Sequence, residues 1–491
     1  MISNLLMLMA AQSAEPKPDW RAIAIADVNA AYRIFAENHP GMANPEDPGF
    51  PARLAAARDA SLKIAFETRD WDGYDKALDA FTDGLSDGHA IVFASDEPGK
   101  KWGEPRWPGF IPAWRGNRLV VHTAGAVSPA PRGSQVLSCD GKPVTQLLRE
   151  RNRGLWFRPA EAGQWWNVGP SLFWGSSPPE PDQLTRCTFR LPDGRLRQAD
   201  LPWEPEPAGW RKQFRGAFAG EETPIGLTQP RSGLWLIGLS SFSPDPAGIA
   251  AYRKLYADID RQRAQLRGAR AIVLDLRFNG GGSWEWGHDA ARHLWGRGAV
   301  DQRMTYYFRN VRIAWRASPD NVAAMSGRIT KIRADGQDDA AIRQQNIADG
   351  MEAALRRGDT YYFERAILGD GQSDRNAPTD LTTPVYVIVH GGCVSSCLDA
   401  IDVFKRFDNV KLIGAPTSAD TLYMDVRRGP LPSNLGRFVL PLKIWHNRPR
   451  KSGEIYRPDI PFNDLDWSTT AFLDRIEADL QAPRRAKLAG R

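Results

Sequence analysis

The sequence lacks any long hydrophobic run beyond its first residues. No later stretch reaches the roughly 18 apolar residues of a membrane-spanning helix, so we expect no stable membrane insertion. Strong charge of one sign is also absent, because 64 basic residues face 58 acidic ones and leave a net charge of +6. No basic cluster is obvious outside the C-terminal tail, and we therefore expect no nucleic-acid partner. Internal repeats and low-complexity tracts are missing as well.

Cysteine is scarce, with four in the chain: Cys139, Cys187, Cys393 and Cys397. No Cys or His pair with zinc spacing joins them, so the sequence predicts no metal site. Cys139 and Cys187 fall in one inferred domain and are able to pair in an exported protein, but spacing alone does not fix connectivity. We expect Cys393 and Cys397 to be buried as small hydrophobic side chains.

The chain is long enough, at 491 residues, for two or three domains, and its 42% hydrophobic content supports substantial cores. An apolar run from Leu5 to Ala11, followed by small residues, resembles a short secretory signal over residues 1–14. No Lys or Arg precedes this run, and a frayed terminus is the alternative. We expect a periplasmic or secreted protein.

The most informative stretch covers residues 384–417. An apolar run stops at a glycine pair, the sequence Cys-Val-Ser-Ser-Cys follows, and an amphipathic segment leads to a second apolar run. This pattern predicts strand, tight turn, helix and strand. A serine at a helix start lies near backbone N–H groups without helical partners, and such donors hold the oxyanion of acyl transfer. Helix capping by Ser395 or Ser396 is the alternative.

A second stretch, residues 269–283, reads ARAIVLDLRFNGGGS. It predicts a buried strand that runs into three consecutive glycines. Bare glycine backbone lets N–H groups approach a ligand closely, although an ordinary loop has the same composition.

Taken together, these stretches resemble the C-terminal-processing (tail-specific) and tricorn-type serine peptidases. The family pattern is Leu-Asp-Leu-Arg-x-Asn-Gly-Gly-Gly, then a strand with a small-residue serine turn, then a strand ending in Gly-x-x-Thr. Residues 274–282, 393–397 and 414–417 match it, and the likeness covers roughly residues 30–465. The resemblance implies that Ser395 is the nucleophile.

The resemblance also implies an oxyanion hole built from N–H groups near Gly281 and Ser396. Neither a metal nor a cofactor is implied, and the substrate would be a peptide or an unfolded protein chain. Two other functions stay open. One is a catalytically inactive peptide- or ligand-binding protein, because retinoid-binding relatives share this core, and the other is an esterase or amidase.

The implied fold is α/β with a Clp protease/crotonase-like catalytic core. The expected parts are an N-terminal helical domain (20–98), a PDZ-like β-rich domain (104–205), the core (226–465) with a helical insertion (316–372), and a C-terminal helix and tail (466–491). PDZ-like modules bind chain ends by adding a strand to a sheet edge. The tryptophan-rich segment 156–174 is expected either to pack in a core or to form an aromatic lid.

The catalytic base is indicated by a departure from one branch of the family. The tail-specific branch uses a Ser–Lys dyad, but Asp420 stands where the lysine belongs, and an aspartate cannot act as a neutral amine. The tricorn-type branch has Asp-x-His, which matches Asp87-Gly88-His89. Imidazole suits a general base because its pKa lies near neutrality. Gly88 replaces the serine of tricorn, and a loop histidine without a catalytic role is the alternative.

A carboxylate should orient the imidazole of His89. Glu454 is the first candidate because it precedes Pro458-Asp459, which resembles the end of the family's core. Asp425, Asp87 and Asp420 remain alternatives. The oligomeric state is not indicated by the sequence.

Overall fold

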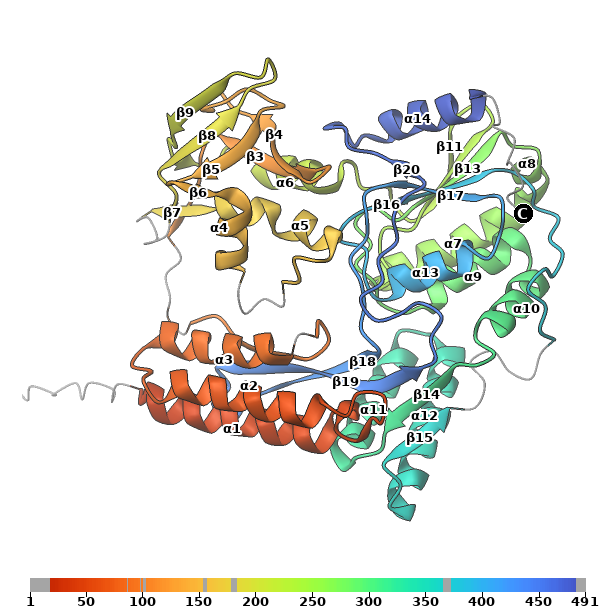
Figure 1. Cartoon of the computed structure of the whole chain (residues 1–491). Coiled ribbons are helices and arrows are strands. Elements are labelled where there is room, and N and C mark those ends of the chain that lie inside the picture. Colours follow the sequence, from red (N-terminus) through yellow and green to blue (C-terminus); the bar gives the residue numbers. More distant parts are fainter. Residues whose placement is uncertain are drawn as a thin grey trace, which may run out of the picture.

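A computed structural model describes residues 18–85, 87–97, 99, 103–152, 157–177, 183–364 and 372–482. The expected signal, residues 1–14, and the last part of the tail lie outside these ranges. Within them, no helix combines the length and apolar character needed to cross a membrane. Figure 1 shows a six-stranded sheet with its helices on the right, a β-rich part at the upper left and the N-terminal helices at the lower left.

The central sheet has six strands in the order β11-β12-β13-β16-β17-β20. All neighbours are parallel except the edge strand β11. The strands are β11 (Gly226–Arg231), β12 (Leu234–Gly238), β13 (Ala271–Asp275), β16 (Val385–Val389), β17 (Val410–Gly414) and β20 (Ile460–Pro461). Every residue of β13 and β16 is buried, as their continuous apolar runs require. The predicted α/β core is confirmed.

Helices cover both faces of this sheet. One face carries α7 (Pro246–Arg261), α9 (Glu285–Trp295) and α13 (Ser396–Phe404), together with α8 (Arg263–Arg267) and α10 (Arg297–Tyr307). The other face carries α14 (Thr469–Gln481), which packs on β12, β13 and β16. The carboxyl ends of β13 and β16 lie at the same edge, where open parallel sheets place their functional loops.

The N-terminal helices pack on a second sheet that contains strands from three regions of the chain. Its order is β1-β19-β14-β15, and β18 pairs with β19. The elements are α1 (Trp20–Asn38), α2 (Phe50–Ala65), α3 (Trp71–Leu85), β1 (Ile91–Ala94), β14 (Arg312–Arg316), β15 (Tyr361–Glu364), β18 (Tyr423–Pro430) and β19 (Gly436–His446). One hydrophobic core joins them to α11 (Pro319–Ala334) and α12 (Asp338–Arg357) of the expected insertion.

The β-rich part contains a sheet in the order β3-β4-β5-β8-β9. Its elements are β3 (Phe110–Arg115), β4 (Arg118–Ala124), β5 (Gln135–Cys139), β6 (Lys142–Pro143), α4 (Val144–Arg151), β8 (Arg186–Arg190) and β9 (Leu196–Asp200). A three-stranded sheet is added by β2 (Glu104–Trp107), β7 (Gly175–Ser177) and β10 (Glu204–Pro205). Cys139 and Cys187 lie opposite each other on β5 and β8 and form a disulfide.

Between this sheet and the core lie α5 (Ala162–Val168), the 3-10 helix η2 (Gly169–Phe173) and α6 (Trp210–Ala219). Trp165 and Trp166 are buried in α5, so these two side chains pack in cores instead of forming a lid. Trp174 is 53% exposed, and Trp156 lies outside the described residues.

Candidate active site

Ser395 lies in the tight turn between β16 and α13. Its backbone has φ 57° and ψ −132°, a conformation that costs a non-glycine residue about 1–3 kcal/mol. Ser395 occupies the N-cap position of α13, but its side chain makes no capping hydrogen bond. The Ser395 hydroxyl therefore does not cap the start of α13, which was the alternative to a catalytic role for this residue.

Three contacts hold this turn in place. The Ser395 N–H donates to Asp420 Oδ1 at 2.8 Å. The Ser396 hydroxyl donates to the Gly282 carbonyl at 2.6 Å. Cys393 and Cys397 form a disulfide that spans the turn on either side of Ser395. Both side chains are fully buried, as expected, but they are joined to each other instead of packing as separate small hydrophobic groups, because the chain reversal before α13 brings their Cα atoms to 5.4 Å, a spacing that suits a disulfide.

The glycine loop after β13 packs directly against the nucleophile turn. A Cβ placed on Gly281, which has φ +100°, would lie 2.8 Å from Ser395 Cβ, so only glycine allows this approach. The Gly281 N–H donates to Asn279 Oδ1 at 2.9 Å, and the Asn279 amide donates to Leu239 O. Ser396 is the first residue of α13, where an N–H has no partner within the helix. Of the two expected oxyanion donors, the Gly281 N–H thus already has an acceptor in Asn279, whereas the Ser396 N–H has none within its helix.

His89 lies where α3 is followed by β1, with its side chain 17% exposed. Asp87 Oδ1 accepts the His89 backbone N–H at 2.8 Å and lies 3.9 Å from Nδ1 of the imidazole. Asp87 Oδ2 accepts the Thr421 hydroxyl at 2.9 Å. Thr421 follows Asp420, so a chain of contacts leads from His89 to Ser395. Among the described residues no hydrogen bond joins the imidazole to the Ser395 hydroxyl; such bonds often tighten only when substrate binds.

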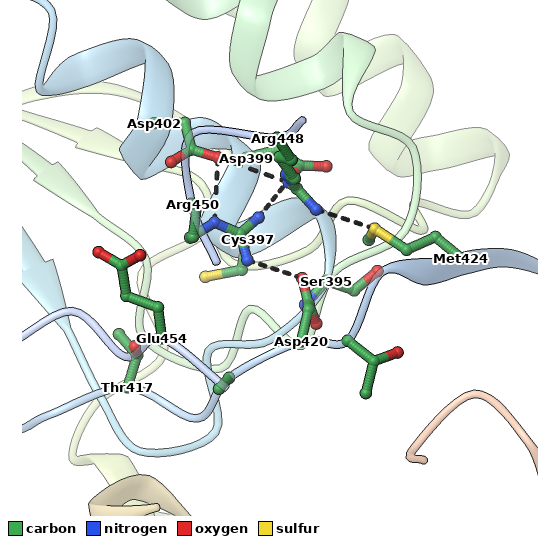
Figure 2. Close-up of polar contacts among 12 residues, drawn as sticks. Ser395, Cys397, Asp399, Asp402, Thr417, Asp420, Met424, Arg448, Arg450 and Glu454 are labelled. Carbon is green, nitrogen blue, oxygen red and sulfur yellow. Dashed lines mark hydrogen bonds and ion pairs between the residues drawn. The ribbon is translucent and has the colours of Figure 1, made fainter. Parts of the chain in front are cut away.

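Asp420 is itself held by a buried charge cluster, drawn in Figure 2. Arg450 lies between three carboxylates, at 3.1 Å from Asp420, 2.8 Å from Asp399 and 3.1 Å from Asp402. Arg448 pairs with Asp399 and Asp402 and donates to the sulfur of Met424. Both arginine side chains are 2% exposed. Nothing in the sequence pattern marked these residues, because their partners are distant along the chain.

Burial and the neighbouring charges act on the pKa of Asp420 in opposite directions. Burial raises it, but Arg450, His89 and Arg448 together hold the pKa of this carboxyl below its usual range. The pKa of Asp399 is raised, because its burial outweighs the attraction of Arg448 and Arg450. Asp420 is therefore the ionised acceptor for the Ser395 N–H.

Glu454, the first candidate for orienting His89, lies on the surface. One carboxylate oxygen accepts the Lys451 backbone N–H at 2.8 Å, and in Figure 2 the side chain points away from Ser395 and Asp420. No hydrogen bond or ion pair joins Glu454 to His89 in the described part of the chain. Asp425 pairs with Arg328 and Lys443 instead. Of the alternatives, Asp87 is the carboxylate that lies beside the imidazole of His89.

Comparison with known proteins places the core of the chain beside one peptidase family. The family model of peptidase family S41 matches residues 236–448, which include the glycine loop, the Ser395 turn and Asp420. Over this core the chain is similar to peptidase family S41, and the resemblance to serine-type peptidases that the sequence suggested is confirmed. His89 and Glu454 lie outside the matched range.

Solved structures extend the likeness to nearly the whole chain. The structure of mature CPAF complexed with lactacystin has a TM-score of 0.61 and 13% identity, over 94% of this chain and 99% of that one. Mature CPAF alone gives a TM-score of 0.60 and 13% identity, over 94% and 98%. At this identity the likeness shows a shared fold, and the expected fold class is confirmed. No curated protein sequence matches the chain.

The Asp420–Ser395 contact predicts the effect of Asp420→Asn. Loss of the charge weakens both the bond to the Ser395 N–H and the pairing with Arg450. We expect labelling of Ser395 by a phosphonate probe to slow by about 10- to 100-fold, as when a reacting group is misplaced. Because folding lowers the pKa of Asp420, its ionised form stabilises the protein above its unfolded pKa of about 3.9, and this is lost as the pH falls through the folded value. The variant should show a shallower loss of stability in acid.

The matched control for this experiment is Asp339→Asn, which changes an exposed carboxylate in the first turn of α12. It should leave labelling and acid unfolding unchanged. Wild-type labelling in Asp420→Asn would contradict the role given to this contact.

The placement of Asp87 and Glu454 predicts opposite outcomes for two amide substitutions. Asp87→Asn should lower turnover strongly and lower the pKa of the acid limb of the pH–rate profile, because the imidazolium loses its counter-charge. Glu454→Gln should be nearly silent, because exposed charges contribute little. Steady-state kinetics across pH measure both. A strong loss in Glu454→Gln beside an active Asp87→Asn would return the orienting role to Glu454.

Proposed function

We propose that this chain hydrolyses peptides or unfolded protein chains through an acyl-enzyme formed on Ser395. The observation that carries the proposal is the Ser395 turn itself. Ser395 follows a parallel strand, precedes a helix and has a positive φ angle, and its side chain makes no capping hydrogen bond. A glycine loop packs against it. This arrangement presents a hydroxyl beside a helix N-terminus, where developing negative charge is stabilised.

In the proposed reaction, Ser395 Oγ attacks the carbonyl carbon of the scissile bond while His89 takes the hydroxyl proton. The Ser396 N–H stabilises the oxyanion, and Gly281 joins it if its bond to Asn279 opens. His89 then gives its proton to the leaving amine, and water, activated by the same imidazole, releases the acyl group.

Asp87 is the carboxylate we propose to orient His89, because it lies 3.9 Å from Nδ1 and also holds the backbone of the same residue. The sequence resemblance gave this role to Glu454. A Ser395–His89–Glu454 arrangement would require the exposed Glu454 side chain to leave its bond to Lys451 and approach the imidazole.

Substitution of the two reacting groups tests the mechanism. Ser395→Ala should abolish both probe labelling and hydrolysis. His89→Ala should lower turnover by about 100- to 10,000-fold, the usual loss of a proton-transfer group. Ser396→Ala keeps the backbone N–H but loses the bond to Gly282 O, so its loss should be smaller than either. Lactacystin, which is bound in the CPAF structure, offers a second probe.

Peptide substrates and matched esters should be compared in the same assay. Hydrolysis of esters without cleavage of peptides would favour the esterase alternative. An unlabelled Ser395 in folded wild-type protein would favour a binding role.

We also propose that the protein acts in the periplasm or outside the cell. The signal-like N-terminus motivates this, and the two disulfides support it, because such bonds persist in oxidising compartments. Mass spectrometry of protein made in its natural host should find an exported chain that has lost residues 1–14 and contains no free thiol. An uncleaved chain with four reduced cysteines in the cytoplasm would contradict the proposal.

A further inference from the structure

The loop that carries Asp420 is buried although it is neither helix nor strand. Thr417, Ser418, Ala419 and Asp420 are 0%, 1%, 1% and 2% exposed. Buried backbone N–H and C=O groups need partners, and a loop cannot supply all of them itself. On one side the partners come from residues 453–456, which precede β20. The Thr417 N–H donates to Tyr456 O, and the Gly453 N–H donates to Asp420 O. The other side is held by side chains that precede and begin α5.

Arg158 and Glu161 hold Ala419, the residue before Asp420, by both of its backbone groups. The Ala419 N–H donates to Glu161 Oε2 at 3.3 Å, and its carbonyl accepts Arg158 Nη2 at 3.2 Å. The two side chains also form an ion pair with Nε and Oε1 2.7 Å apart. Their exposed fractions are 19% and 8%. We call these two residues the Ala419 clamp.

The clamp interacts electrostatically with two carboxylates of the proposed catalytic chain of contacts, Asp87 and Asp420. Burial raises the pKa of Asp87, and Arg158 is one of several neighbouring groups that partly offset this rise. Burial raises the pKa of Glu161, and the charge of Asp420 raises it further. The charge of Arg158 thus acts on Asp87, and that of Asp420 acts on Glu161.

Helix α5 touches both loops that flank Ser395. A Cβ on Gly163 would lie 2.3 Å from Ser418 N, so the helix backbone rests directly on the buried loop. A Cβ on Gly391, in the loop before the nucleophile turn, would lie 2.2 Å from Trp166 Cβ. The Ser418 hydroxyl donates to Gly391 O at 2.7 Å and ties the two loops together.

The same helix is anchored to the β-rich sheet. Trp165 stacks on Trp114 of β3 with ring centroids 5.1 Å apart. The guanidinium of Arg115, the last residue of β3, lies 4.3 Å from the ring of Trp166 and donates to the Ala217 and Asp464 carbonyls. The position of the clamp is thereby fixed by β3 as well as by the catalytic core.

We propose that Arg158 and Glu161 are positioning residues of the active site, which fix Ala419 so that Asp420 holds the Ser395 turn in its reactive conformation. The β-rich part of the chain is then a structural component of the catalytic centre through α5. This inference rests on the proposed role of Ser395. It gives no chemical step to either residue.

The test is a double-mutant cycle on full-length protein, read as the rate of phosphonate labelling of Ser395 and as kcat and KM on a peptide reporter. Glu161→Ala should lower the labelling rate and kcat by about 10- to 100-fold, with KM nearly unchanged, because the reacting groups are misplaced while substrate contacts remain. Glu161→Gln keeps an oxygen acceptor for the Ala419 N–H and should recover most of the rate. Glu161→Ala is then combined with Asp420→Asn. The fold-loss of labelling rate in this double variant should be clearly smaller than the product of the two single fold-losses.

The matched control is Arg261→Ala, which breaks another Arg–carboxylate pair of i,i+3 spacing, with Asp258 on α7, where Arg261 is 64% exposed. It should leave all three readouts unchanged. Thermal unfolding gives the folded fraction to which each rate is normalised. If Glu161→Ala does not fold, Arg158→Ala replaces it in the cycle.

Wild-type labelling rates in both clamp variants, or losses that multiply with that of Asp420→Asn, would overturn the inference. Failure of the wild-type protein to label at Ser395 would instead overturn the proposed function. The two failures are thus distinguishable, because only the second one affects the wild-type protein.

Discussion

The proposed active site depends above all on the hydrogen bond from the Ser395 N–H to the carboxylate of Asp420. Ser395 has a backbone conformation that an L-residue rarely adopts, so it needs support from outside its own turn. A charged acceptor gives a stronger bond to an N–H than a neutral one. The disulfide between Cys393 and Cys397 restrains the same turn covalently. Strain at the nucleophile is thus balanced by one ionic hydrogen bond and one cross-link.

An ionised Asp420 in a buried position needs compensating charge. Arg450 provides it, but the same guanidinium also serves Asp399 and Asp402, and Arg448 adds the second positive charge. Three carboxylates face two guanidinium groups; the pKa of Asp399 is raised mainly by burial, and the neighbouring Asp402 and Asp420 raise it further. The hydroxyls of Tyr456 and Tyr307 donate to Asp402 and spread its charge further. Stability and reactivity are coupled here, because changing any one charge disturbs the others.

Local patterns in the sequence were enough to predict the central sheet, the Ser395 turn and the junction that holds His89. Each depends on neighbours within about ten residues, and turn and strand signals act over that range. The sequence marked Asp420 only as a departure from a lysine, and it gave no sign of Arg450. Glu454 was selected by its distance from the end of the core, and the fold turns that residue to the surface. Ion pairs between remote segments leave no periodic pattern to detect.

The pairing of β1 with β19 has a consequence for the timing of synthesis. Ile91 lies opposite Val439, so the strand that follows His89 is completed only by residues near the end of the chain. A ribosome makes the N-terminal helices first, and domains fold in the order in which they emerge. We therefore expect the proposed nucleophile Ser395 and the proposed base His89 to come together only after β19 has left the ribosome. A nascent chain is thus expected to lack a complete peptidase centre, so that it cleaves neither itself nor neighbouring proteins during synthesis.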